Sequence, residues 1–183
     1  MKVTSPFQEA LDRILTVRRE AVVNGISTTY WEYGSAQQAR TIVMIHGFRG
    51  DHHGLEPIVA SMDGDFHVII PDLPGFGESA DFTGPGTIDE YAQWLISFIH
   101  QVAPGRETFV VGHSFGSIVV SAALAGGLDV SAACLINPIA ANALKGPRGV
   151  LTRLAVFYYQ LAAWLPEQLG FSLLRNSMIV RIM

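Results

Sequence analysis

A serine between two glycines is the residue of this sequence whose surroundings best suit covalent chemistry. Ser114 is the centre of G-H-S-F-G (112–116), which joins a short apolar run (108–111) to a stretch of helical character. A serine held in a tight strand-to-helix turn needs small residues two positions before and after it, and Gly112 and Gly116 meet this need. The helix N-terminus favours negative charge that develops near the hydroxyl. The pattern predicts a nucleophilic serine, with an ordinary serine in a glycine-rich turn as the alternative.

Two further motifs follow apolar runs earlier in the sequence. H-G-F-R-G (46–50) comes directly after residues 41–45, and P-D-L-P-G-F-G-E-S (71–79) comes directly after residues 66–70. Together with G-H-S-F-G, in this order and at this spacing, they make the sequence resemble the α/β-hydrolase superfamily, in particular its small, cap-bearing members with a serine nucleophile. The resemblance extends over about residues 20–140.

This resemblance assigns expected roles to the residues of the three motifs. It implies that Ser114 is the nucleophile and that the backbone N–H groups of Phe48 and Phe115 form the oxyanion hole. Four more residues are expected to shape the loop and the turn around them: His46, Gly47, Gly112 and Gly116. The resemblance also implies a structural role for Asp72, which we expect to bind nearby backbone N–H groups rather than to act as the catalytic acid.

The partners that a nucleophilic serine needs are harder to find. A serine hydroxyl requires an adjacent base that an acid orients, and in this fold the chain order is serine, acid, histidine. No histidine follows Ser114, and the only acids after it are Asp129 and Glu167. A rearranged triad of His46, Asp72 and Ser114 is the alternative, since all three follow parallel strands and should lie near one sheet edge.

Truncation is the simpler explanation, because the resemblance places the acid and the histidine after a helical cap. We expect about 80–110 further residues in a complete enzyme. Residues 132–136 would then form an uncovered sheet edge in the present chain. We therefore expect residues 1–183 alone to be poorly soluble and nearly inactive.

The remaining pattern predicts the elements that position the motifs. A capping-box pattern at Ser5 predicts a helix to about Arg19, and Asn24-Gly25 predicts the turn of an antiparallel hairpin. Apolar runs and helical stretches then alternate, which predicts an α/β fold with a mainly parallel, doubly wound sheet. The hairpin strands are expected at 20–24 and 27–33, the parallel strands at 41–45, 66–70, 108–111 and 132–136, and the helices at 54–61, 88–102 and 115–125.

Two domains are expected, a hydrolase core at residues 1–145 and an incomplete helical cap or lid segment at residues 146–183. The second contains two mostly apolar stretches, 150–165 and 168–182, rich in aromatic residues. Such a cap would favour a small, hydrophobic, acyl or ring-bearing substrate, although the aromatic residues could instead pack the cap onto the core.

Composition excludes several other classes. With 49% hydrophobic and 15% charged residues the chain is not a disordered one, and its net charge of −4 does not suggest nucleic-acid binding. No secretory signal and no apolar stretch of about 20 residues is present, so we expect a cytoplasmic protein without stable membrane insertion. No nucleotide motif or cofactor is indicated, and the oligomeric state is not predicted.

Metal binding is not expected either. Cys134 is the only cysteine, so neither a disulfide nor a cysteine-based metal site can form within the chain. His52 and His53 lack an obvious partner carboxylate and are expected in a solvated loop. His67 and His100 are expected to face water.

The function predicted from the sequence is hydrolysis of carboxylic esters or related acyl compounds through an acyl-enzyme at Ser114, with acyl transfer as a variant. A serine at this position argues against branches that need a carboxylate nucleophile there. The alternative is a non-catalytic hydrolase-fold protein that binds a ligand, or an inactive fragment.

Overall fold

The computed structural model describes residues 6–62 and 66–139, together with Phe157 and Trp164. By its internal contacts the chain divides into two units, Met1–Ile139 and Ala140–Met183. The expected cap segment at residues 146–183 lies outside the described residues, except that Phe157 and Trp164 are helical. The fold given below is therefore that of the first unit.

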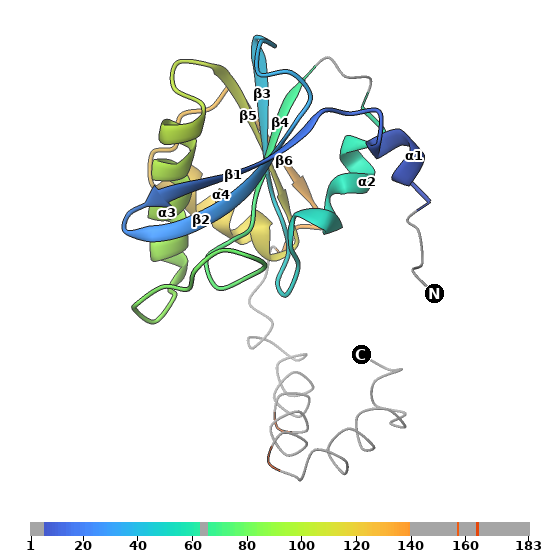
Figure 1. Ribbon diagram of the computed structural model, residues 1–183. Coiled ribbons are helices and arrows are strands. Elements are labelled where there is room, and N and C mark those ends of the chain that lie inside the picture. Colours follow the sequence, from blue (N-terminus) through green and yellow to red (C-terminus); the bar gives the residue numbers. More distant parts are fainter. Residues whose placement is uncertain (1–5, 63–65, 140–156, 158–163, 165–183) are drawn as a thin grey trace. The chain divides into compact units, whose positions relative to one another are not determined.

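A six-stranded mixed sheet forms the centre of this unit, in the order β1-β2-β4-β3-β5-β6 (Figure 1). β1 pairs with β2, and β2 with β4, in antiparallel fashion, whereas the other neighbours are parallel. This confirms the predicted α/β class with its N-terminal hairpin. The strands are β1 (Thr16–Val23), β2 (Ile26–Tyr33), β3 (Arg40–Ile45), β4 (His67–Pro71), β5 (Glu107–His113) and β6 (Ala132–Ile136).

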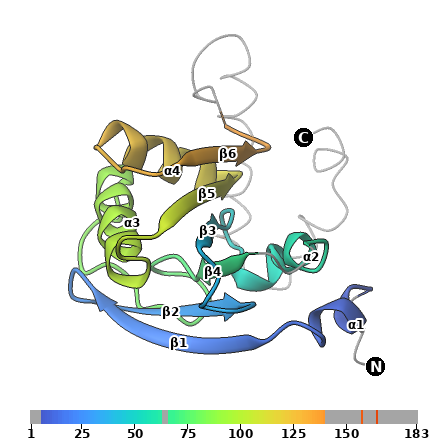
Figure 2. The same cartoon turned by 90° about the horizontal axis from the view of Figure 1, so that it is seen from above.

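Helices cover both faces of the sheet. Figures 1 and 2 show α3 (Ile88–Val102) and α4 (Phe115–Ala125) on one face, and α2 (Glu56–Val59) on the other. Alternate residues of β3 face opposite sides of the sheet. Val43 packs in the core cluster that contains residues of α3 and α4, and Met44 packs in the cluster that contains Val59 of α2. A strand that is buried on both faces is apolar at most positions, which explains why residues 42–45 of β3 show no polar alternation.

The helix α3 begins and ends where the sequence predicted. Its N-terminus carries a capping box in which the Thr87 hydroxyl accepts from the Glu90 N–H, while the Glu90 carboxylate accepts from the Thr87 N–H. Trp94 and Phe98, both fully buried, stack at 5.3 Å and place the helix against the sheet. The bounds of α4 also agree with the prediction.

The N-terminal helix was predicted wrongly. The helix α1 covers only Gln8–Leu11, and β1 begins already at Thr16; Ser5 lies outside the described residues. Residues of helical spacing such as Val17 belong to β1, where they pair with β2 over the strand's whole length. Cross-strand pairing has overridden the local periodicity, as tertiary contacts do when a segment's intrinsic preference is weak. The helix expected at 54–61 is likewise reduced to a 3₁₀ turn, η1 (His52–Gly54), and the short α2.

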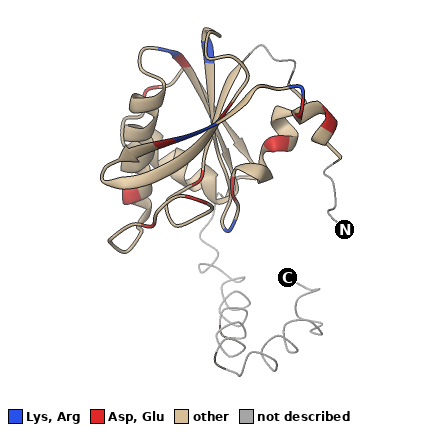
Figure 3. Ribbon diagram, viewed as in Figure 1, with Lys and Arg blue, Asp and Glu red and all other residues tan. Residues whose placement is uncertain are grey.

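Charged residues are few on the inner strands, and Glu32 is the only one on β2. Figure 3 shows them on β1, on the helices and in the loops, while β3 and β5 carry charge only at their first residues, Arg40 and Glu107. Among the described residues, no helix is both long enough and apolar enough to cross a bilayer.

The packing of α3 yields a stability prediction. We expect Phe98→Ala to lower the free energy of unfolding by about 3–5 kcal/mol, because it opens a cavity between α3 and the sheet. Gln93→Ala, at an exposed position of the same helix, should change it by less than about 0.5 kcal/mol. Chemical denaturation followed by tryptophan fluorescence measures both. Equal effects of the two substitutions would contradict the assigned packing.

Candidate active site

Ser114 lies in the sharp bend between β5 and α4. Its backbone has φ 53° and ψ −115°, a conformation that costs a non-glycine residue about 1–3 kcal/mol. The bend is held by the Ser114 N–H, which donates to the carbonyl oxygen of Ile136 in β6 at 3.0 Å. The residue is half-buried rather than enclosed in the core. The strand–turn–helix geometry predicted for G-H-S-F-G is confirmed.

The two glycines of the motif are required by close backbone contacts. A Cβ atom on Gly112 would lie 2.7 Å from the carbonyl oxygen of Gly116, and one on Gly116 would overlap the carbonyl oxygen of Ile45 at the end of β3. Backbone oxygens of a strand or helix cannot move aside as flexible side chains do. Any larger residue would therefore displace the bend that presents Ser114.

The loop after β3 lies directly against this bend. A Cβ atom on Gly47 would lie 3.3 Å from the Cβ of Ser114, and 3.3 Å from the Nδ1 of His113. The loop turns back through a hydrogen bond from the Gly50 N–H to the Gly47 carbonyl at 3.1 Å, with Arg49 at φ 57°. The structure thus brings the backbone directly before Phe48 beside the bend that bears Ser114.

Aromatic rings gather beside Ser114. Phe48, 65% exposed, contacts Phe76 and Phe115 edge-to-face, with ring centroids 5.6 and 6.1 Å apart. Phe115 in turn contacts Tyr91 at 5.4 Å. We call Phe48, Phe76 and Phe115 the aromatic cluster. Its members come from the loops after β3 and β4 and from the start of α4, so the cluster is formed by the fold and not by one segment.

His46 ties two loops together and is not placed to serve as a base. Its Nδ1 donates to the Gly47 carbonyl at 2.8 Å, and its Nε2 accepts from the Leu73 N–H at 2.9 Å. Burial lowers the pKa of His46, only partly opposed by the bond to Gly47, so the ring is neutral. Both ring nitrogens are engaged with backbone, which argues against the rearranged triad and supports the structural role expected for this residue.

Asp72 is fully buried and accepts hydrogen bonds from η1 and from a later residue of its own loop. Its Oδ1 accepts from the N–H of His52 at 2.9 Å and its Oδ2 from the N–H of Glu78 at 2.8 Å, which confirms the expected backbone bonding. The His52 Nδ1 donates to the same Oδ1 at 3.1 Å. Although burial raises the pKa of Asp72, the bonds from the His52 side chain and from these backbone groups lower it below its ordinary value. Asp72 is therefore an ionised structural anchor.

Two histidines differ from their predicted surroundings. His52 is buried and stacks on Trp31 with ring centroids 3.3 Å apart, so the solvated loop expected for it was wrong. His67 is also buried, and both its ring nitrogens lack a hydrogen bond, with Glu32 3.8 Å away. Burial lowers the pKa of His67, which keeps the ring neutral. Side-chain burial at the start of a strand depends on the covering layer, which sequence position alone does not specify. His53 and His100 are exposed, as predicted.

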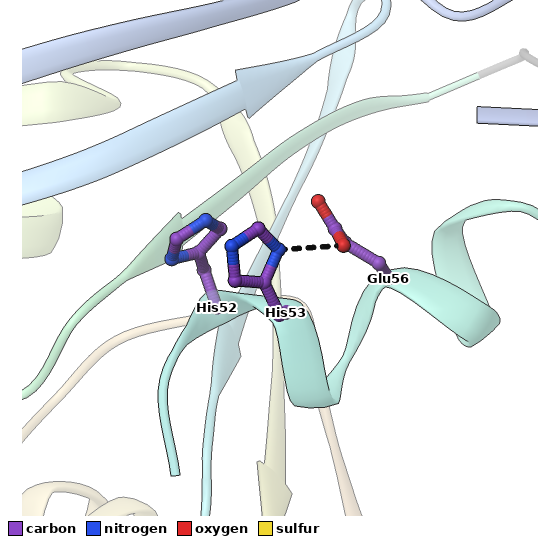
Figure 4. Close-up of side chains that lie close together, drawn as sticks. All are labelled: His52, His53 and Glu56. Carbon is purple, nitrogen blue, oxygen red and sulfur yellow. Dashed lines mark hydrogen bonds and ion pairs between the residues drawn. The ribbon is translucent and has the colours of Figure 1, made fainter. Parts of the chain in front are cut away.

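A group of possible metal ligands was missed in the sequence. The Nδ1 of His53 donates to Glu56 Oε2 at 2.8 Å, and His52 lies beside them (Figure 4). Burial lowers the pKa of His53, but the bond to Glu56 outweighs it and the net shift is upward. The sequence pattern that could have indicated this group is H-H-x-x-E over residues 52–56, which places a carboxylate one helical turn after two adjacent imidazoles.

Comparisons with known proteins agree with this geometry. A sequence profile of a family described as "Alpha/beta hydrolase family" matches residues 42–180. The chain is 28% identical over 98 residues to an (E)-2-((N-methylformamido)methylene)succinate hydrolase of Acinetobacter baylyi, which covers 54% of this chain and 36% of that protein. It is 30% identical over 109 residues to Lipase 3 of a Moraxella species, covering 57% and 33%.

Among solved structures, the epoxide hydrolase CorEH without ligand is similar, with a TM-score of 0.66 at 20% identity. The likeness covers 82% of this chain and 54% of that one and indicates a shared fold alone. The matched part of the chain spans only about a third of the length of the two curated relatives.

The role of Asp72 can be tested by the pH dependence of stability. We expect Asp72→Asn to lower the free energy of unfolding by about 2–4 kcal/mol near neutral pH, because three donors, two of them buried, lose an ionised acceptor. The folded-state pKa lies below the ordinary value of 3.8, so the stabilisation is fully present above that value and is lost as the pH falls through the folded pKa.

Urea unfolding at about pH 7 and about pH 3 should therefore show a smaller difference between wild type and Asp72→Asn at the lower pH. Asp129→Asn, at an exposed position, is the matched control and should change stability little at either pH. A difference for Asp72→Asn that is independent of pH would contradict an ionised anchor.

Proposed function

Because the chain belongs to the alpha/beta hydrolase family, we propose that Ser114 is the nucleophile of a serine hydrolase acting on carboxylic esters or related acyl compounds. The observation that carries this proposal is the positive-φ bend at Ser114, closely flanked by the loop that bears Phe48. Strain of this kind is commonly found at functional sites, where surrounding structure holds a residue in a conformation it would not otherwise adopt.

In the proposed reaction the Ser114 oxygen attacks the acyl carbonyl and loses its proton to a base. The tetrahedral intermediate expels the alcohol, which takes up that proton, and leaves an acyl-enzyme. Water then attacks the acyl group and releases the carboxylic acid and the free serine. The N–H groups of Phe48 and Phe115 would bind the oxyanion. The position of Phe115 supports the role proposed for its N–H, because it is the first residue of α4, where N–H groups have no partner within the helix.

Three of the described histidines near the loop after β3 are bound to other groups and are not placed to act as the base. His46 binds backbone through both nitrogens, His52 binds Asp72, and His53 binds Glu56. No histidine follows Ser114 in the sequence. We therefore propose that Ser114 acts with a histidine and an acid that this sequence does not contain. The activity belongs to the whole enzyme, since the chain matches only part of its relatives.

A serine at position 114 also distinguishes this chain from enzymes that attack with a carboxylate. A serine alkoxide suits acyl carbonyls, whereas opening of an epoxide by covalent catalysis in this fold calls for a carboxylate nucleophile. The fold likeness to an epoxide hydrolase is thus compatible with different chemistry, because folds host several reactions and the site decides among them.

The aromatic cluster supports a hydrophobic acyl group as substrate. Phe48 exposes most of its ring beside the bend at Ser114, and an exposed aromatic surface next to a reactive group gains free energy when an apolar chain covers it. We propose a small, largely apolar ester or related acyl compound.

Chemical rescue tests the nucleophile in the chain as it is. We expect a fluorophosphonate probe to modify Ser114 slowly, because the hydroxyl lacks a base. Added imidazole should accelerate the modification by about tenfold or more, since general-base catalysis contributes up to several orders of magnitude. Peptide mass spectrometry identifies the modified residue and its rate of modification.

Ser114→Ala should abolish this modification, and Ser121→Ala, an exposed serine of α4 beyond the bend, should leave it unchanged. If imidazole accelerates modification of Ser114 no more than that of exposed serines, the proposed nucleophile is wrong. That result would favour a protein that uses the hydrolase fold for binding.

The substrate proposal can be tested with probes of two chain lengths. Phe48→Ala should reduce the preference for a long-alkyl over a short-alkyl fluorophosphonate by about threefold to tenfold, because about 1 kcal/mol of apolar contact is lost. Leu124→Ala, at an exposed position of α4, is the control and should leave the ratio unchanged. An unaltered ratio in Phe48→Ala would argue against contact between Phe48 and the acyl chain.

A further inference from the structure

We propose that His52, His53 and Glu56 form a binding site for one divalent transition-metal ion of the zinc type. One ligand atom from each residue, two imidazole nitrogens and one carboxylate oxygen, lies within 4.8 Å of the other two. Figure 4 shows the two rings side by side, with the Glu56 carboxylate next to His53. Within the described ranges 6–62 and 66–139, no other set of three such side chains meets this distance.

The donor set suits a borderline-soft ion. Imidazole and carboxylate ligands bind zinc with bonds of about 2.0–2.2 Å, whereas magnesium and calcium prefer oxygen ligands throughout. An ion equidistant from three donors 4.8 Å apart would lie at most about 2.8 Å from each, so small side-chain rotations bring all three to bonding distance. Three protein ligands leave a coordination position for water.

The His52 ring is held in place by two contacts. Its Nδ1 donates to the ionised Asp72 at 3.1 Å, which keeps the proton on Nδ1 and leaves the lone pair on Nε2. Carboxylate–histidine pairs of this kind commonly support bound zinc, because they fix the tautomer and increase the basicity of the ring. Stacking on Trp31, with the planes only 11° apart, fixes the orientation of the same ring.

The carboxylate of Glu56 is held by a buried tyrosine. The hydroxyl of Tyr33 donates to Glu56 Oε1 at 3.0 Å, and Glu56 Oε2 faces His53. His53 is exposed, with 66% of its side chain accessible, which gives an ion a path from solvent. The 2.8 Å between His53 Nδ1 and Glu56 Oε2 is shorter than the ~3.3 Å that separates two ligands on a tetrahedral ion, so these two side chains need to move apart only slightly. Metal binding would displace the proton that now joins them and release it to solvent.

This site would join η1 and α2, the two elements that follow the loop beside Ser114. Asp51 accepts from the His53 N–H at 3.0 Å and so begins η1 directly after that loop. A bound ion would connect η1 to α2, at a position distinct from the bend itself. The inference does not depend on the identity of the nucleophile, and it requires no metal in the proposed reaction.

Titration of the full 183-residue chain with zinc chloride, followed by isothermal titration calorimetry, tests the proposal. We expect one ion per chain, and an affinity reduced at least tenfold in both His53→Ala and Glu56→Gln. The second substitution keeps an oxygen that can accept from Tyr33, so it removes the charged ligand with little disturbance of packing. His100→Ala, an exposed histidine on α3, is the control and should bind as wild type does.

A second measurement needs no variant. Zinc should protect His53 from modification by diethyl pyrocarbonate, mapped by mass spectrometry, while exposed His100 stays reactive. Absence of saturable binding up to about 1 mM zinc would overturn the proposal. Equal affinities in wild type and both ligand variants, or no selective protection of His53, would overturn it as well.

Discussion

The first turn of α4 lies so near the end of β3 that a Cβ atom on Gly116 would overlap the carbonyl oxygen of Ile45. This approach leaves the chain only a short, sharp path from β5 into the helix, and Ser114 takes the positive φ that the path requires. The cost of that conformation is offset by the surrounding contacts of a six-stranded sheet covered on both faces. The position of Ser114 in the bend thus results from backbone packing rather than from any property of serine.

The loops around the bend are fixed by buried polar contacts. His46 links the loop after β3 to the Leu73 N–H, and Asp72 links the loop after β4 to His52 and Glu78. Neither residue has spare capacity to take part in proton transfer with Ser114. In an interior of low dielectric, fully satisfied polar groups of this kind rigidify their surroundings. Rigidity is what an oxyanion hole made of backbone N–H groups needs, since its donors must be oriented before charge develops.

Different parts of the sequence were predictable to different degrees. The parallel strands, α3, α4 and the bend at Ser114 agree with their predictions because apolar runs, caps and glycines act locally there. The predicted helix and strand boundaries were wrong at the N-terminus, where β1 extends into a segment with helical spacing because it pairs with β2. The exposure predicted for His52 and His67 was wrong, since a polar residue is buried or exposed according to the layer that covers it.

The sequence by itself determined the alternation of strands and helices, the glycine-flanked serine and the absence of a later histidine. Only the tertiary structure decided that Gly47 approaches Ser114, that three phenylalanines from separate segments meet, and that His52 binds Asp72. Local patterns report the conformations that neighbouring residues favour. Contacts between residues far apart in sequence depend on strand order and register, which are fixed when the whole sheet assembles.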